Sequence, residues 1–300
     1  MAGRFIMRRV RPRRFVNSMA PTGWGDSTYA ETQWERSRNA ATRWAIAGVV
    51  LGMLVAFVAF APAEILARAV ASGTSDRVLL TDARGTLWSG SAVVALTGGA
   101  GSRDASALPG RLEWTLGVAG GGLSLKLRQA CCLNDTVTLL LKPGFGRFSA
   151  RLVPPPGWVG QWPSALLAGL GTPWNTLQLG GRLRIASPGL TVEWVQGRVL
   201  FDGALDLEVL QASSRLSTLD TLGSYRLSLA GSAARPGDPA QLTLSTLDGA
   251  LRLSGAGTWS SSGLRFRGEA TASEADATAL SNLLNIIGRR TGARSVISIG

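Results

Sequence analysis

The sequence predicts a mainly β protein: a single N-terminal transmembrane helix followed by an antiparallel β meander, a curved sheet or a sandwich, with two short helices. Residues 44–61 form an apolar stretch without a charged side chain. Beyond it, apolar residues recur at every second position, as in a strand with one buried face. The 38 Gly and 13 Pro are spread among these apolar runs, which is typical of many turns between short strands.

The apolar stretch 44–61 is long enough to cross a membrane. A helix of this length rises about 27 Å at ~1.5 Å per residue, close to the ~30 Å thickness of the hydrocarbon core. Two A-x-A patterns, at 59–61 and 61–63, also suit a cleaved signal peptide, and a buried core helix is a third interpretation. The run exceeds the usual ~7 to 15 residues of a signal, and a long segment precedes it, so we favour a retained span.

Arginine distribution sets the expected orientation and the domains. The segment before the span contains many more arginines than acids, which predicts that it stays in the cytoplasm. We therefore expect a disordered Arg-rich cytoplasmic tail over residues 1–43, a transmembrane helix over 44–61, and a periplasmic β-rich domain over 62–300. The basic residues of the tail are Arg4, Arg8, Arg9, Arg11, Arg13, Arg14, Arg36, Arg38 and Arg43, against Asp26, Glu31 and Glu35.

Composition argues against an enzyme. The chain has no His, which excludes a His general base, a Ser-His-Asp triad and the common His-ligated metal sites. The 19 acids are scattered without a D-x-D or EF-hand spacing, and the glycines 120–122 lack the Lys-Ser/Thr of a phosphate-binding loop. We expect no catalytic residue, no cofactor and no metal.

The net charge of +12 and the pI near 11.3 raise the question of nucleic-acid binding. Half of this charge lies in the first 43 residues, and the rest is scattered singly rather than clustered with aromatic residues. We expect no nucleic-acid partner, and we expect membrane lipid as a partner through residues 44–61.

The elements beyond the span follow from periodicity and turn residues. Residues 62–70 have the spacing of a short helix, and strands fill 78–153. After the Pro154–Gly157 break we predict one short helix over 158–170. Four strands follow over 176–210, with turns at Gly180-Gly181, at 187–189 and at Asp202-Gly203. Further strands lead to a helix over 274–290, with Ser273 as its N-cap, and to a last strand at the C-terminus.

Cys131 and Cys132 are the only cysteines, and they are adjacent. In an oxidising periplasm they are candidates for a bond. Neighbouring Cα atoms lie ~3.8 Å apart, below the usual disulfide range, so a vicinal bridge requires the strand to end there. Two buried thiols, a vicinal disulfide and intermolecular bridges are the alternatives. We predict an intramolecular structural role and no redox catalysis, because the C-x-x-C arrangement is missing.

Several short runs, in this order and spacing, resemble type II secretion system protein N of Gram-negative bacteria. The resemblance covers roughly residues 62–300, whereas the Arg-rich tail departs from the shorter cytoplasmic ends of that family. The runs are Gly85-Thr86-Leu87-Trp88-Ser89-Gly90, Leu222-Gly223-Ser224-Tyr225, Thr246-Leu247-Asp248-Gly249-Ala250-Leu251, Gly255-Ala256-Gly257-Thr258-Trp259, Phe266-Arg267-Gly268-Glu269-Ala270 and Leu283-Leu284-Asn285-Ile286-Ile287-Gly288-Arg289-Arg290.

The resemblance implies a single-pass inner-membrane component that supports export of folded proteins from the periplasm. It implies other secretion-system subunits of the inner-membrane platform as partners, and no catalytic residues. A second function fits the same alternation: a membrane-anchored β-groove protein whose apolar face carries lipid across the envelope.

The span and the arginines before it predict the topology of the full chain. When a reporter that works only in the periplasm is fused after Gly300, we expect the fusion to show reporter activity. A reporter that is active only in the cytoplasm, fused at the same residue, serves as the control. Activity of the cytoplasmic reporter alone would reverse the predicted orientation, and a mature protein that starts at Pro62 or Glu64 would identify a cleaved signal.

Overall fold

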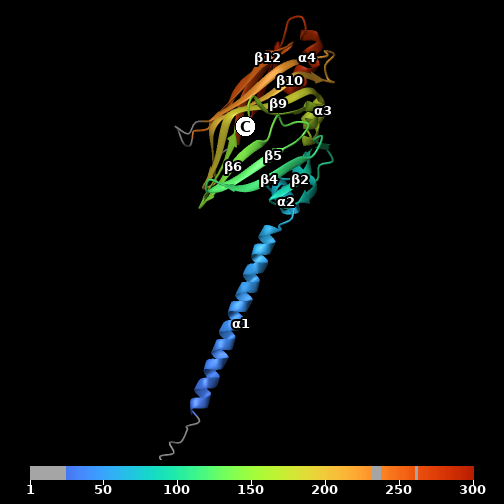
Figure 1. Ribbon diagram of the computed structural model, residues 1–300. Helices are drawn as coiled ribbons and strands as arrows, with labels where there is room; N and C mark the ends of the chain where they lie inside the picture. The colour runs from blue at the N-terminus through green and yellow to red at the C-terminus, as the bar shows by residue number, and fades with distance from the viewer. Residues whose placement is uncertain (1–24, 232–237, 261–262) are drawn as a thin grey trace, which may run out of the picture. The chain divides into compact units, whose positions relative to one another are not determined.

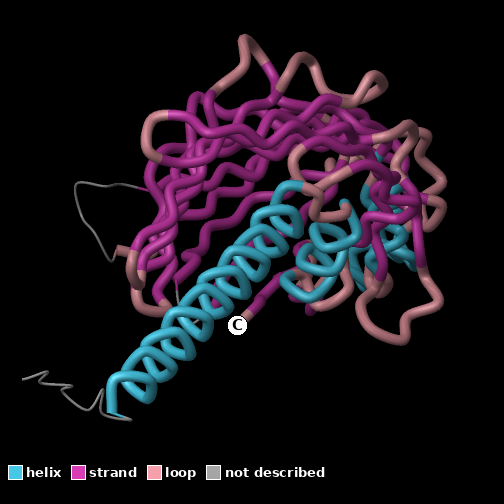
Figure 2. The backbone as a smooth tube through the Cα atoms, turned by 60° about the horizontal axis from the view of Figure 1, so that its bottom comes forward, coloured by secondary structure: helices cyan, strands magenta, loops and turns pink. Residues whose placement is uncertain are grey.

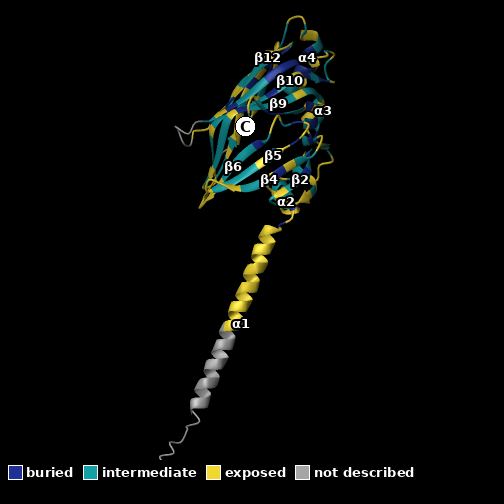
Figure 3. Cartoon of the chain, viewed as in Figure 1, coloured by how far each residue is buried: buried dark blue, intermediate teal, exposed yellow. Residues whose placement is uncertain are grey.

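The computed structural model describes residues 25–231, 238–260 and 263–300, with side chains from residue 41 onward (Figure 1). The chain divides into two units, Met1–Val58 and Ala59–Gly300. In the first unit, helix α1 (Gly25–Ala59) contains a stretch, Ala41–Ala59, that is apolar and long enough to cross a membrane. The side chains of this stretch are exposed throughout (Figure 3). The expected disorder of residues 1–43 is wrong from Gly25 onward, and residues 1–24 lie outside the described ranges.

The second unit is one antiparallel sheet with a few short helices. The sheet has 16 strands, and its main path runs β1-β2-β4-β5-β6-β7-β9-β10-β11-β12-β13-β14-β16-β15, while β3 pairs with β2 and β8 pairs with β9. The strands are β1 (Val78–Gly85), β2 (Ser89–Thr97), β3 (Ala105–Ala107), β4 (Leu112–Ala119), β5 (Gly122–Arg128), β6 (Val137–Gly144), β7 (Arg147–Val153), β8 (Trp158–Pro163), β9 (Leu179–Val195), β10 (Arg198–Ser214), β11 (Gly223–Gly231), β12 (Ala240–Asp248), β13 (Leu251–Ser260), β14 (Gly263–Ala272), β15 (Arg289–Thr291) and β16 (Arg294–Ile299). The helices are α2 (Ala63–Gly73), the 3-10 helix η1 (Ser164–Leu170), α3 (Trp174–Leu177) and α4 (Ala277–Ile287).

Two long strands occupy the middle of the sheet where four short ones were predicted. β9 and β10 have 17 residues each and form a hairpin. Its turn lies at Gln196-Gly197, where both residues have positive φ. Asp202-Gly203 was the predicted turn, but this pair lies inside β10, opposite Leu190 and Thr191. The turns predicted at Gly180-Gly181 and at 187–189 also lie inside a strand, β9. The ladder shifts register where Ala204 pairs with Gly189 and Asp206 with Ala186, so residues 187–189 form a bulge of β9 and not a turn.

Two of the predicted helices differ in detail. The expected helix over 158–170 is wrong in its first half, because Trp158–Pro163 pairs as β8 with β9 and only η1 is helical. The C-terminal helix is confirmed but shorter: it ends at Ile287, and the following arginines belong to β15. Ser273 lies before the helix, where its hydroxyl donates to a carboxylate oxygen of Asp276, and Asp276 is the N-cap position.

The ladder puts apolar side chains on one face of the sheet, which we call the inner face. Leu125 stands opposite Leu116 on one side and Leu139 on the other, and the row continues through Leu152 to Leu190. The inner face continues onto β10–β14 through the same cross-strand pairs. Its apolar members from β4 to β14 include Trp114, Leu116, Val118, Leu123, Leu125, Leu127, Leu139, Leu141, Phe148, Leu152, Leu190, Val192, Trp194, Phe201, Leu205, Leu207, Leu227, Leu229, Leu242, Leu244, Trp259, Leu264 and Phe266.

The sheet is strongly curved (Figure 2), and a contact between two aromatic rings places the inner face on its concave side. Phe201 on β10 and Trp259 on β13 have ring centroids 5.3 Å apart. Their strands are three positions apart in the sheet, which in a flat sheet separates them by ~14 Å. The rings meet because the inner face is concave.

Helices close one end of the inner face. Leu280, Leu283 and Leu284 of α4 are buried against Tyr225 and Leu251. α2 contributes Ala63 to a second cluster, which also contains Trp114, a residue of the inner face. The ribbon shows α2, α3 and α4 along the same end of the sheet, away from the hairpin turns (Figure 1). Burial raises the pKa of Tyr225, whose hydroxyl donates to the carbonyl of Leu251 at 3.0 Å.

A buried carboxylate on the opposite face joins three central strands. Glu208 on β10 is 3% exposed and accepts hydrogen bonds from Arg184 on β9 and from Arg226 on β11. The closest nitrogen–oxygen distances are 2.5 Å to Arg184 and 2.8 Å to Arg226. Burial acts to raise the pKa of Glu208, but the hydrogen bonds of the two guanidinium groups outweigh it and hold the pKa below its ordinary value of 4.5.

Replacing this carboxylate tests its role in the sheet. Because its pKa is lower in the folded chain, Glu208 stabilises the fold above pH 4.5, and this contribution is lost as the pH falls toward the folded-state pKa. We expect Glu208→Gln to lower the free energy of unfolding at neutral pH by about 1–3 kcal/mol. Denaturant unfolding of the full chain in detergent, followed from pH 7 to 3, measures the difference, which should shrink in acid.

Glu193→Gln is the matched control, because Glu193 also lies on a central strand and has no ion pair within the described ranges. A stability loss for Glu208→Gln no larger than that of the control would contradict a structural role for the buried carboxylate.

Candidate functional site

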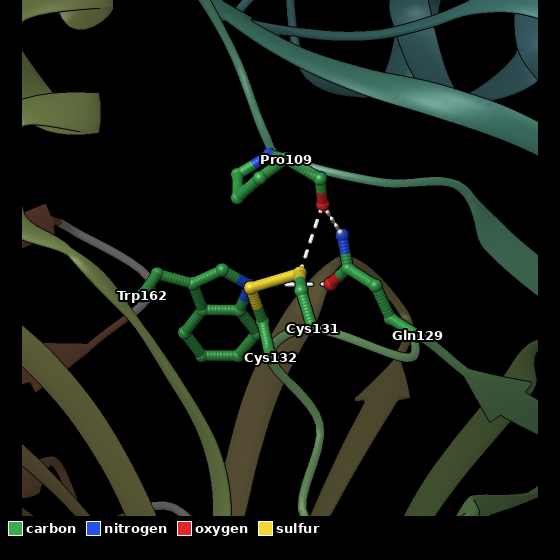
Figure 4. The surroundings of a disulfide bond; sticks show 5 residues. All are labelled: Pro109, Gln129, Cys131, Cys132 and Trp162. Carbon is green, nitrogen blue, oxygen red and sulfur yellow. Dashed lines mark hydrogen bonds between the residues drawn. A yellow bond between two sulfur atoms is a disulfide. The ribbon is translucent and has the colours of Figure 1, made fainter.

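The two cysteines lie in a loop directly after β5, as the prediction required. β5 ends at Arg128, and the structure places the Sγ atoms of Cys131 and Cys132 2.19 Å apart as a vicinal disulfide with a Cα–Cα distance of 3.7 Å (Figure 4). Cys132 is 4% exposed, whereas Cys131 faces solvent. The oxidation state in the cell stays a prediction.

Polar contacts hold this loop against two other segments. Buried Gln129 donates through Nε2 to the carbonyl of Pro109 at 2.9 Å and accepts from Nε1 of Trp162 at 3.2 Å (Figure 4). The backbone N–H of Gln161 donates to the carbonyl of Cys132 at 2.7 Å. The Sγ atom of Cys131 lies 2.9 Å from the Pro109 oxygen, which is a close contact because a disulfide sulfur has no proton to donate. The arrangement joins β5 to β8 and has the character of a structural clamp.

The inner face offers a different kind of surface. From β4 to β14 its described positions carry apolar side chains, glycine, a tyrosine and a threonine, while Lys, Arg, Asp and Glu of these strands point to the opposite face. Away from the helices, most of its leucines keep an intermediate exposure instead of being buried (Figure 3). The apolar surface is therefore only partly covered by the chain.

The end of the sheet that carries the hairpin turns has an unusual composition, and we call it the hairpin end. It contains the turns between β4 and β5, β6 and β7, and β9 and β10, together with the neighbouring ends of β13, β14 and β16. Large apolar side chains are exposed there, namely Val118 (83%), Phe145 (110%), Phe148, Trp194, Trp259, Leu264 and Ile299. Basic side chains accompany them: Lys142, Arg147, Arg198 and Arg265.

These four basic residues have no ion pair within the described ranges. Arg147 and Arg198 both lie opposite Val195 in the ladder, so their backbones flank one position of β9. Phe148 and Trp194 are paired across β7 and β9, with ring centroids 5.6 Å apart. The hairpin end thus combines aromatic rings on the inner face with basic side chains on the opposite face.

A polar hollow of about 850 Å³ lies at the other end of the sheet, near η1 and α3. Its lining includes Asp104, Asn175, Arg215 and Asp220. The amide Nδ2 of Asn175 donates to Asp104 at 3.0 Å, which connects α3 to the segment before β3. Of the described side chains, only Ser164 and Ser295 have buried oxygen atoms without a partner, and neither lines this hollow. No cluster of His, Cys, Asp or Glu suited to a metal occurs in the described part of the chain.

Comparison with known proteins identifies the family. The family described as "Type II secretion system (T2SS), protein N" matches residues 76–297. The chain belongs to the type II secretion system protein N family. The match begins just before β1 and ends within β16, so it covers the sheet except for the last two residues of β16 and leaves out α1 and α2. Searches among curated proteins and among solved structures found no match.

The sequence pointed to the cysteine pair but not to the hairpin end. Val118, Phe148, Trp194 and Trp259 are far apart in the sequence and gather only through the strand register. The available signal was the set of large apolar or aromatic residues close to predicted turns.

Mass spectrometry can decide the state of the cysteine pair. Full-length protein is unfolded and alkylated without reduction, so that buried Cys132 is also reachable. We expect no added group and a mass deficit of two hydrogens on the peptide that contains Cys131 and Cys132. A reduced sample is the control and should gain two groups. Two added groups without reduction, or a crosslinked second peptide, would contradict the vicinal bridge.

Proposed function

We propose that this protein is a non-enzymatic, inner-membrane-anchored component of a type II protein secretion system that supports export of folded proteins from the periplasm. The observation that carries the proposal is the family match, which spans the sheet from before β1 into β16. An apolar helix at Ala41–Ala59 supports single-pass anchoring, and the arginines before it support a cytoplasmic N-terminus.

The β unit is proposed to act in the periplasm by binding other secretion-system subunits of the inner-membrane platform. A wide sheet with two exposed surfaces suits an assembly role, because it presents a polar face and an apolar face to different partners. The Cys131–Cys132 bridge is proposed to have a structural role in an oxidising compartment. Residues 1–24 lie outside the described ranges, and no role is assigned to them.

Secretion in a deletion strain tests the proposal. We expect loss of the gene to leave folded substrates in the periplasm, and the full chain to restore their appearance in the medium. Replacing residues 44–61 with an unrelated apolar span of equal length should preserve rescue, because the proposed role of the span is anchoring. A variant with three arginines within residues 44–61 is the control, and it should not rescue because charges at the centre of the span are costly.

Normal secretion in the deletion strain would contradict a required role in secretion. If the arginine-containing variant rescues secretion and is found in the soluble fraction, the proposed membrane anchoring is contradicted. The proposed role in secretion is not affected by that result.

A further inference from the structure

We propose that the inner face binds the acyl chains of a membrane phospholipid, which enters at the hairpin end. This inference is independent of the secretion role, because it rests only on the chemistry of the sheet.

The first support is the uniform chemistry of a large, partly exposed surface. Leu125, Leu139, Leu152 and Leu190 form one continuous row across β5, β6, β7 and β9, and all four have intermediate exposure. In the described strands from β4 to β14, charged side chains lie on the opposite face. Contiguous apolar surface that stays exposed marks a site of interaction with a protein, a membrane or a ligand.

The second support is that the leucine row from β5 to β9 offers no hydrogen-bonding group to a polypeptide. Backbone N–H and C=O groups of the central strands are engaged in the ladders. An unpaired polypeptide segment laid on this face would bring amides that lack partners, which costs several kcal/mol for each buried group. Alkyl chains need no such partners, so they match the surface better than a peptide does.

The dimensions also fit. On β10, the inner-face residues extend from Val199 to Val209, which spans about 33 Å at ~3.3 Å per residue. Each leaflet of a bilayer contributes about half of the ~30 Å hydrocarbon thickness, so an extended acyl chain fits within this length. The concave curvature marked by the Phe201–Trp259 contact lets side chains from several strands surround one chain.

The third support is the composition of the hairpin end. Exposed Trp194 and Trp259 and exposed Phe145 match the amphipathic and apolar groups that settle at membrane interfaces. The basic side chains of this end, Arg147 and Arg198 among them, point to the opposite face and take no part in the contact with the lipid. The helices close the opposite end, which leaves the hairpin end as the entrance for a lipid.

Photolabelling of the full chain tests the proposal. The protein is reconstituted in vesicles of phosphatidylethanolamine and phosphatidylglycerol that contain phosphatidylglycerol with a diazirine on its acyl chain. After irradiation, mass spectrometry locates the adducts. We expect adducts on the peptides that carry Leu139, Leu152 and Val192, as well as on the apolar part of α1, which serves as an internal standard. Adducts confined to α1 would overturn the proposal.

A pair of neighbouring substitutions tests the face. Leu190→Arg puts a charge on the inner face, and Thr191→Arg puts the same charge on the opposite face of the same strand. Leu190→Arg should reduce inner-face adducts by about tenfold relative to α1, because a charge next to an alkyl chain is strongly unfavourable. Thr191→Arg should leave them unchanged. Equal labelling in both variants would contradict the assigned face, and circular dichroism checks that each retains its strands.

If Leu190→Arg fails to fold, crosslinking in cells provides a second test of lipid binding to the inner face. Benzoylphenylalanine is introduced at Leu152, with Arg151 on the opposite face as the control position. We expect an adduct of phospholipid mass at position 152 and none at 151. A polypeptide adduct at 152 would identify the inner face as a protein-binding surface and overturn the lipid proposal.

Discussion

The two-residue period of the strands is the constraint on which the rest of this structure depends. A shift of one residue in any ladder would turn its leucines to the charged face and its arginines to the apolar face. Long strands make this register harder to keep, and β9 and β10 accommodate irregularities at Ser187-Pro188 and at Gln211, which has positive φ. Buried Glu208, bonded to Arg184 and Arg226, adds a polar constraint that one register alone satisfies.

The two ends of the inner face differ because helices bury only one of them. At that end, α4 covers the strands near Leu251, and α2 covers the strands near Trp114. Backbone contacts also tie the segment that follows the apolar helix to the sheet: the N–H of Leu87 donates to the carbonyl of Ala61, and Pro62 bridges to Thr86. The start of the β unit is thus fixed to the first hairpin, whereas the hairpin end keeps its aromatic side chains exposed.

Local patterns predicted most of the strands, since alternation depends only on which face a residue takes. They failed where one signal has two structural meanings. Asp202-Gly203 reads as a turn, but it stands within β10, and the turn falls at Gln196-Gly197. Trp158 and Trp162 fit helical spacing, yet β9 offers an unpaired stretch that β8 occupies. The cysteine pair is visible in the sequence, but the hairpin end exists only after distant turns are brought together.

If the chain is anchored as proposed, it does not need strong lipid binding to use its inner face. Transfer of a ~20-residue apolar helix into lipid is effectively irreversible, so the proposed span would by itself hold the protein at the membrane. The aromatic residues of the hairpin end can then serve access to the inner face instead of attachment to the membrane. A tethered surface meets its ligand at a high effective concentration, so contacts that are weak for a free domain suffice here. The two proposed roles can therefore occupy opposite faces of the same sheet, with the polar face for secretion-system subunits and the apolar face for acyl chains.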